Sequence, residues 1–162
     1  MIGYLIEISL LDLVRPTRRI IQIPGRIHFK KLQDIIQIAF SWRGVSDGIF
    51  YLPDGSKAFT EEDANLSQSD IKLRSMRYVN ITKYMEQYQE LFYVYHHWVH
   101  HIRLIAKMME IEENYAKVIT YEGENPKEDE LAGENNIAPA TEHYPLALTN
   151  LLLRDPLNLK KK

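Results

Sequence analysis

The chain contains no cysteine, and this absence excludes disulfide bonds, thiolate nucleophiles and the zinc and iron–sulfur sites that cysteines hold. Small secreted domains often depend on disulfides, so the absence also favours a cytoplasmic location. The segment from Met1 to Glu7 lacks the basic start and the long apolar run of a signal peptide. No segment approaches the roughly 20 apolar residues that a membrane-spanning helix needs. We therefore expect a cytoplasmic protein without a membrane partner.

The net charge of −2 says little about partners, but the charges are unevenly distributed along the chain. Between positions 15 and 31 there is no acidic residue and there are six basic ones: Arg15, Arg18, Arg19, Arg26, Lys30 and Lys31. Between positions 110 and 134 there are nine acidic residues and two lysines. Such asymmetry is typical of a face that binds nucleic acid or an acidic protein surface. The plainer interpretation is that the charges occupy opposite solvated faces of a globular domain.

The length of 162 residues and the hydrophobic share of 45% are typical of one globular domain with its own core. No internal repeat or linker divides the sequence, so we expect a single domain over residues 1–162. Two segments fall outside its regular elements. They are an acidic loop at about 122–143 and a short basic tail at 160–162.

Alternation of apolar and polar residues predicts a hairpin near the N-terminus. Residues 2–12 have the period of two that is typical of a half-buried strand. Residues 18–23 form a second apolar run, which ends at Pro24-Gly25. Two strands so close in sequence are expected to pair in an antiparallel hairpin.

Apolar residues at helical spacing predict a long amphipathic helix over residues 28–41. Its apolar side consists of Phe29, Leu32, Ile35, Ile36, Ala39 and Phe40. Its solvated side consists of Lys30, Lys31, Gln33, Asp34 and Gln37. Arg43-Gly44 is typical of a helix end. Shorter helices are expected at 81–88 and, near the C-terminus, at 144–153.

Further strands are expected at 49–52, 91–95, 98–109 and 115–121. Pro53-Asp54-Gly55-Ser56 predicts a tight turn, because Asp-Gly supplies the positive φ that such a turn needs. The runs at 91–95 and 98–109 flank His96-His97 and predict another hairpin. These elements predict an α+β fold: a mixed, mainly antiparallel sheet on which the long helix and the C-terminal helix pack.

The segment from His96 to His101 is the most conspicuous candidate for chemistry, since four of its six residues are histidines. On a helix, His97 and His101 would share a face and could bind zinc or nickel. On a strand, neighbouring side chains point to opposite faces, so His96, His97, His100 and His101 cannot all converge. The spacing of a known zinc motif is absent. We therefore expect no metal site and no cofactor.

General acid–base catalysis needs a titrating group held near a substrate. The sequence offers one pairing for this role, His100 with Glu128 or Asp129. There is no nucleophile motif, Gly-rich phosphate loop or metalloprotease signature, so we lean away from an enzyme. Trp98 joins the basic residues as a candidate for binding a partner, although a tryptophan within a strand pattern more often belongs to the core.

Several segments, in this order, resemble one protein family. They are Arg15-Pro16-Thr17-Arg18-Arg19-Ile20, Ile23-Pro24-Gly25, the run from Leu32 to Trp42, Trp98-Val99-His100-His101-Ile102, and the run from Gly123 to Asp129. Over most of the chain they resemble the plasmid pRiA4b open-reading-frame-three-like family. That family shows a Pro-x-x-Trp-Arg-Arg strand, a Val-Pro turn, a helix ending in Gly-Trp, a Trp-x-His-x-Ile strand and a Gly-Glu…Pro-Pro-Glu-Asp loop. The resemblance implies a compact α+β domain, often described as an insertion-element passenger or resolvase-like protein, and it implies no established activity.

The departures from the family pattern concern acidic and aromatic positions. Tyr93-Val94-Tyr95-His96 stands where the family has Asp-Phe-Gly-Asp, and Thr17 replaces the tryptophan before the two arginines. The residues 45–48 replace a His-rich segment. If the family has a carboxylate-based site, this chain has lost part of it and retains the positions of His100, Glu128 and Asp129.

These observations favour a non-enzymatic binding protein associated with a plasmid, another mobile element or a phage, such as an inhibitor or adaptor that acts on a host protein. One alternative is a small hydrolase or nuclease-like enzyme that uses His100 with Glu128 and Asp129. Another is a nucleic-acid binder that uses the basic region from Arg15 to Lys31. A pocket with histidine and carboxylates would favour the enzyme. A continuous basic face would favour the nucleic-acid binder, and a flat apolar patch would favour a protein that binds another protein.

Overall fold

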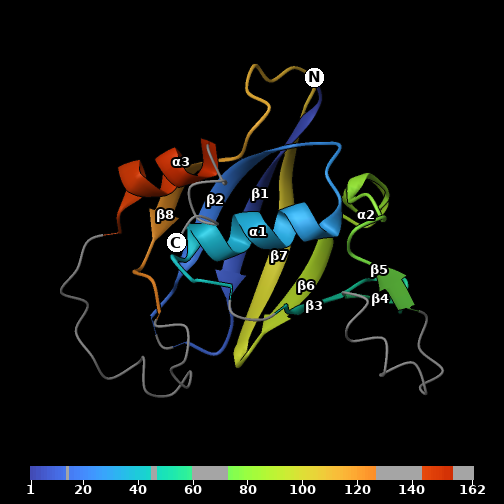
Figure 1. Cartoon of the computed structure of the whole chain (residues 1–162), viewed down its shortest axis with the longest axis horizontal. Helices are drawn as coiled ribbons and strands as arrows, with labels where there is room; N and C mark the ends of the chain where they lie inside the picture. The colour runs from blue at the N-terminus through green and yellow to red at the C-terminus, as the bar shows by residue number, and fades with distance from the viewer. Residues whose placement is uncertain (14, 45–46, 60–72, 127–143, 155–162) are drawn as a thin grey trace.

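The described chain forms one sheet with helices on one of its faces, as the computed structural model in Figure 1 shows. The structure describes residues 1–13, 15–44, 47–59, 73–126 and 144–154. In chain order the elements are β1 (Gly3–Leu10), β2 (Arg18–Pro24), α1 (Phe29–Ala39), β3 (Ile49–Tyr51), β4 (Lys57–Phe59), β5 (Leu73–Ser75), α2 (Thr82–Gln87), β6 (Glu90–Tyr95), β7 (Trp98–Met108), β8 (Lys117–Glu122) and α3 (Leu146–Arg154). None of these helices has the length and apolarity to cross a bilayer.

The eight strands lie in the order β5-β4-β3-β6-β7-β1-β2-β8. Neighbouring strands are antiparallel at every step except between β4 and β5. The hairpins predicted from residues 2–23 and 91–109 are confirmed as β1–β2 and β6–β7. The predicted α+β class with a mainly antiparallel sheet is therefore confirmed.

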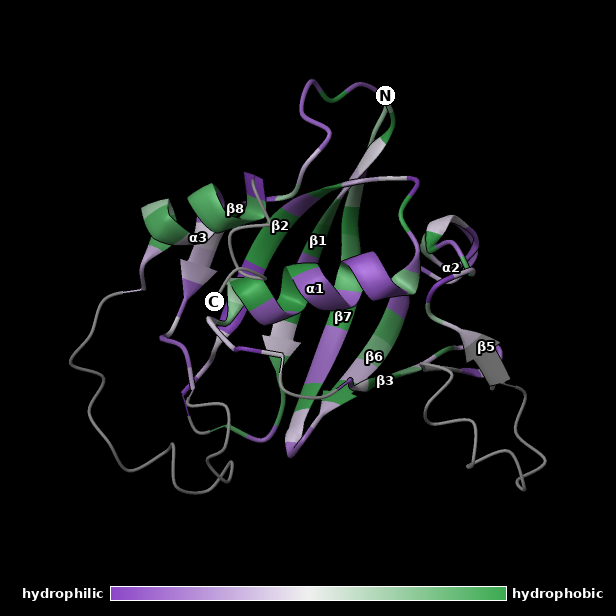
Figure 2. Ribbon diagram, viewed as in Figure 1, coloured by the Kyte–Doolittle hydropathy of each residue, from purple (hydrophilic) through white to green (hydrophobic). Residues whose placement is uncertain are grey.

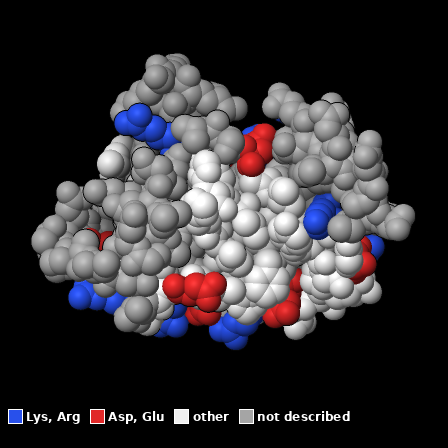
Figure 3. Space-filling model, turned by 90° about the horizontal axis from the view of Figure 1, so that it is seen from below, with Lys and Arg blue, Asp and Glu red and all other residues white. Residues whose placement is uncertain are grey.

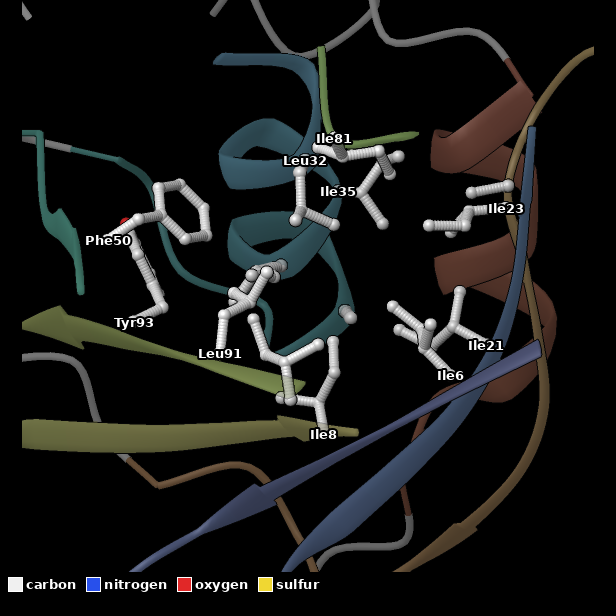
Figure 4. Packing of buried hydrophobic residues seen from close by; sticks show 14 of the residues in the cluster. Ile6, Ile8, Ile21, Ile23, Leu32, Ile35, Phe50, Ile81, Leu91 and Tyr93 are labelled. Carbon is white, nitrogen blue, oxygen red and sulfur yellow. The ribbon is translucent and has the colours of Figure 1, made fainter. Parts of the chain in front are cut away.

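The hydrophobic core lies between α1 and one face of the sheet. Leu32 and Ile35 of α1 point toward isoleucines of β1 and β2 and toward Leu91 of β6, as Figure 4 shows. Phe29, at the start of the helix, packs against Phe50 of β3, with ring centroids 5.0 Å apart. Burial of these apolar side chains is the main favourable contribution to folding.

The helix α1 is shorter than the long helix predicted over residues 28–41, since it has eleven residues and ends at Ala39. Its end is a Schellman motif, in which Trp42 N donates to Gln37 O at 2.8 Å and Ser41 N donates to Ile38 O at 3.0 Å. Ser41 occupies the left-handed region with a φ of 57°. The stop therefore falls at Ser41 and not at Arg43-Gly44.

The expected solvated side of α1 is only partly solvated, since Gln33 and Gln37 are buried and Lys30, Lys31 and Asp34 are half-buried. Both amides bond to the hydroxyl of Tyr93 on β6: Gln37 Nε2 donates to it at 2.9 Å, and it donates to Gln33 Oε1 at 2.8 Å. Gln33 Oε1 also accepts from Gly48 N at 2.7 Å. The sheet and the segment after the helix thus enclose a side of α1 that sequence periodicity assigns to water.

The other two helices lie on the same side of the sheet as α1. Tyr84 of α2 packs edge-on against Phe29, with centroids 5.6 Å apart. Tyr144, which precedes α3, donates to the carbonyl of Ala39 at 2.6 Å and so ties α3 to the end of α1. The opposite face of the sheet carries no helix within the described residues, and we call it the open face.

We expect Leu32→Ala and Ile36→Ala each to lower the free energy of unfolding by about 2–4 kcal/mol, because each leaves a cavity in the core. Lys31→Ala, on the same helix but only half-buried, should change it by less than about 0.5 kcal/mol. Urea melts of the three variants provide the measurement. Losses below about 0.5 kcal/mol at Leu32 and Ile36 would show that these side chains do not fill the core.

Candidate functional site

The four histidines of the segment 96–101 occupy three different environments. His96 and His97 form the exposed turn between β6 and β7, and His96 has a φ of 52°. His100 points into the core, whereas His101 lies on the open face with its Nε2 3.1 Å from a carboxylate oxygen of Glu90. Among the described residues there is no group of three histidines, aspartates or glutamates placed to hold a metal.

His100 is fully buried in a cage of aromatic rings. Its ring centroid lies 5.2 Å from that of Phe40, 5.3 Å from that of Trp42 and 5.2 Å from that of Tyr93. Its Nδ1 lies 3.0 Å from the carbonyl of Tyr93, which can only accept, so Nδ1 carries the proton of the neutral ring. Its Nε2 has no hydrogen-bond partner in the described part of the chain.

Burial lowers the pKa of His100 to about 4, so its imidazole is neutral at physiological pH. The other partners proposed for it in catalysis, Glu128 and Asp129, lie outside the described residues. An enzyme that pairs these groups therefore stays a prediction. A fully buried histidine is poorly placed to contact a substrate, and this position of His100 disfavours the enzyme.

Arg19 is also fully buried, although the sequence groups it with the exposed basic residues. Its guanidinium donates to the carbonyls of Arg18 and Glu122 at 2.8 and 3.0 Å, and to Asn125 Oδ1 at 2.8 Å. It stacks on the Tyr144 ring at 4.1 Å and lies 4.9 Å from the centroid of Phe40. Arg19 therefore supports the core and does not face a surface partner.

The remaining basic residues of the segment 15–31 do not form one basic face. Lys30 Nζ lies 2.9 Å from Asp47 Oδ1 and 3.7 Å from Asp34 Oδ1. Arg15 and Arg26 are exposed, and Lys31 is half-buried. Figure 3 views the molecule from the end that carries the β6–β7 turn, and there the basic side chains are interspersed with acidic ones. The described charges seen at this end are therefore of both signs.

Arg18 belongs to a ladder of ion pairs that crosses four strands of the open face. Arg103 of β7 pairs with Glu7 of β1 at 3.2 Å, Glu7 pairs with Arg18 of β2 at 3.4 Å, and Arg18 pairs with Glu122 of β8 at 3.2 Å. The strand register places Arg103 directly opposite Glu7 and Arg18 directly opposite Glu122, whereas Glu7 and Arg18 meet diagonally, since Glu7 faces Ile20 and Arg18 faces Ser9. Charge alternates along this row, so it neither attracts nor repels a polyanion as a whole.

Beside the ladder, the open face becomes apolar. The residues are Ile49, Tyr51, Phe92, Val94 and Val99, from β3, β6 and β7, and we call them the open-face patch. The register aligns Ile49, Val94 and Val99 in one row and places Tyr51 beside Phe92 in the next. Tyr51 is exposed and the other four are half-buried. A strand with one solvated face usually alternates between apolar residues that point inward and polar residues that point outward. The strand β6 departs from this rule, because it has an apolar or aromatic side chain at every position from 91 to 95.

Trp98, the aromatic candidate for binding, lies in the core and not on this patch. It is almost fully buried, and its ring centroid is 6.2 Å from that of Trp42. The sequence reasoning did not identify the open-face patch. The sequence feature that could have revealed the patch is the uninterrupted apolar run of β6. A strand with only one buried face normally alternates between apolar and polar residues, so an apolar run implies apolar side chains on both faces.

The fold and motifs match known proteins of undetermined function. The family model of the plasmid pRiA4b ORF-3-like proteins matches residues 3–136. The chain belongs to this family. Among curated proteins, none matches. The crystal structure of the protein of unknown function MM3350 from Methanosarcina mazei Go1 superposes with a TM-score of 0.70 at 21% identity, over 95% of this chain and 90% of that chain, and so shows a shared fold.

Several of the residues that carry the pRiA4b ORF-3-like resemblance meet in one buried cluster. Arg19 and His100 lie against Phe40, and Trp42 lies between Phe40 and Trp98. Trp42 Nε1 also donates to the carbonyl of Pro126, in the loop that matches the family's Gly-Glu…Pro pattern, at 2.8 Å. In this member of the pRiA4b ORF-3-like family the described motif residues therefore hold the fold together.

We expect acid to destabilise the protein through His100. The folded-state pKa of about 4 lies below the ordinary value of 6.5, so the unfolded chain takes up a proton first as the pH falls. The stability that the neutral, buried His100 allows is fully present above about pH 6.5 and falls as the pH drops toward 4. By pH 4.5 the free energy of unfolding should have decreased by about 2–3 kcal/mol. Urea melts at pH 7.5 and 4.5 measure it. His100→Phe should flatten this dependence and His97→Gln should not; equal slopes in both variants would contradict the assignment.

We expect Arg19→Lys to lower the free energy of unfolding by about 2–3 kcal/mol. The planar guanidinium lies between the rings of Phe40 and Tyr144 and donates to three oxygens, and a lysine ammonium cannot reproduce this arrangement. Its neighbour Arg18 provides the matched control, since Arg18→Lys keeps an exposed charge and should cost less than about 0.5 kcal/mol. Thermal and urea melts distinguish the two. Equal losses would place both arginines in the same environment and refute the buried role of Arg19.

Proposed function

We propose that the protein is a non-enzymatic binding protein that engages another protein through the open face of its sheet. The observation that supports this most strongly is the open-face patch, five apolar side chains from three adjacent strands on the face that carries no described helix. A contiguous apolar surface of this kind is a common feature of protein-binding sites. Its aromatic members, Phe92 and Tyr51, belong to residue types enriched at interfaces.

The ladder beside the patch gives such an interface a polar border. Arg103 lies next to the apolar rows, because it faces Glu90 of β6 across the β6–β7 register. His101 separates Phe92 from the ladder and stacks on the Phe92 ring, with centroids 4.9 Å apart. An apolar centre beside fixed charges is the usual arrangement of a specific interface, in which the charges set orientation more than affinity.

The family description supports a role on a mobile element, since it names an open reading frame of a plasmid. A binding protein encoded by a plasmid or phage commonly acts on host components, and an inhibitor or adaptor of a host protein fits this setting. The two other functions have less support. Of the basic segment, Arg19 is buried and Arg18 and Lys30 are paired with carboxylates, and His100, the candidate general base, is buried.

The proposal is tested by a photo-reactive benzoylphenylalanine placed at Val99, on the β7 side of the patch, and expressed in the native host. We expect irradiation to give one discrete cross-linked species. The same group at the exposed Lys83 of α2, on the helical side, serves as the control and should give none.

A second substitution makes the result specific to the patch. Val94 lies directly opposite Val99 in the register, so Val94→Glu should abolish the adduct while the melting temperature stays close to that of the parent. No adduct from Val99, or an adduct that persists with Val94→Glu, would show that the open face is not the binding surface.

A further inference from the structure

The helix α3 packs Leu146, Leu152 and Leu153 on the core, yet its other two leucines point outward while its two polar residues before Arg154 are covered, which is unusual for a surface helix. Thr149 is almost fully buried and Asn150 is half-buried, whereas Leu148 and Leu151 are 54% and 56% exposed. Figure 2 shows α3 coloured as hydrophobic along most of its visible surface. The two leucines are three positions apart and therefore lie side by side on one face of the helix.

This orientation is fixed by contacts on the inner side of α3, so the helix cannot rotate to bury the leucines. Asn150 acts as a strand partner for the sheet edge: Val118 N donates to Asn150 Oδ1 at 2.7 Å, and Asn150 Nδ2 donates to Val118 O at 3.1 Å. Leu153 is buried in the core. A rotation would break these contacts and leave the edge of β8 unpaired, which sheet proteins avoid.

We propose that the outer face of α3 is the contact between two copies of this chain, which pair their α3 helices antiparallel about a two-fold axis. Such an axis requires a surface that complements itself. The segment Leu146–Leu153 meets this condition, because it contains no charged residue. Leucines at a spacing of three from each copy interdigitate in an antiparallel helix pair.

The charges at the two ends of α3 favour the second copy as the occupant. The helix runs antiparallel to β8, since Tyr144 at its start lies 4.7 Å from Tyr121 and Arg154 at its end lies over Tyr115 at 5.5 Å. Glu124 follows Tyr121 and so belongs to the end where α3 begins, whereas Glu122 lies on the open face and pairs with Arg18. In an antiparallel pair, Arg154 of each copy comes to the acidic end of the other, and two such pairs form by symmetry.

The proposal is tested with the whole chain by sedimentation equilibrium from about 5 to 500 μM. A contact centred on two short helices is small, so we expect a reversible dimer with a dissociation constant in the micromolar range. Leu148→Lys and Leu151→Lys should each weaken it at least about tenfold. Tyr78→Lys removes the most exposed apolar side chain of another surface, 77% exposed, and should leave the dimer intact.

A charge exchange tests the antiparallel arrangement separately. Arg154→Glu should weaken the dimer, and adding Glu124→Arg to the same chain should restore it. Circular dichroism and an unchanged melting temperature of the monomer confirm that each variant is folded. A monomer at every concentration, or a dimer that neither leucine substitution weakens, would overturn the proposal. Retention of the Val99 cross-link in Leu151→Lys would show that the open face acts independently of this contact.

Discussion

The packing of α1 against one face of the sheet is the interaction on which the other features depend. Eight of the eleven residues of α1 are buried, so the helix is enclosed on more sides than an ordinary surface helix. Its Schellman end turns the chain so that Phe40 and Trp42 reach His100 and Arg19. A sheet of eight strands with its helices gathered on one face leaves the other face for contacts with other molecules.

This arrangement separates the core from the surface that we propose for recognition. The covered face holds the charged and titratable groups that look functional in the sequence, Arg19 and His100, where burial deprives them of contact with solvent. The open face holds charges that are paired with one another and an apolar patch, of which Ile49 also packs against the core. Arg19 and His100, which look chemically interesting in the sequence, therefore pack in the core, and the proposed binding surface consists of ordinary aliphatic and aromatic side chains.

Local periodicity was sufficient to predict the β1–β2 and β6–β7 hairpins and the fold class, because alternation and turn residues are properties of short segments. It was insufficient where tertiary contacts decide. Gln33 and Gln37 looked solvated until Tyr93 supplied hydrogen bonds for both. Arg18 and Arg19 were grouped by charge, yet neighbours on a strand face opposite sides, and only the buried partners of Arg19 show which side is the core. The outward position of Leu148 and Leu151 depends on the bond between Asn150 and the edge of β8, which lies about 30 positions away in sequence.

The central claim is that one face of the sheet is core and the other is available to a partner, and solvent accessibility measured at methyl groups tests it most directly. A soluble nitroxide added to methyl-labelled protein broadens the NMR signals of methyls that it can approach. We expect broadening at Val94 and Val99 of the open-face patch and none at Ile6 and Ile21 of the covered face. Equal protection of the two sets would show that both faces are buried and would contradict the account.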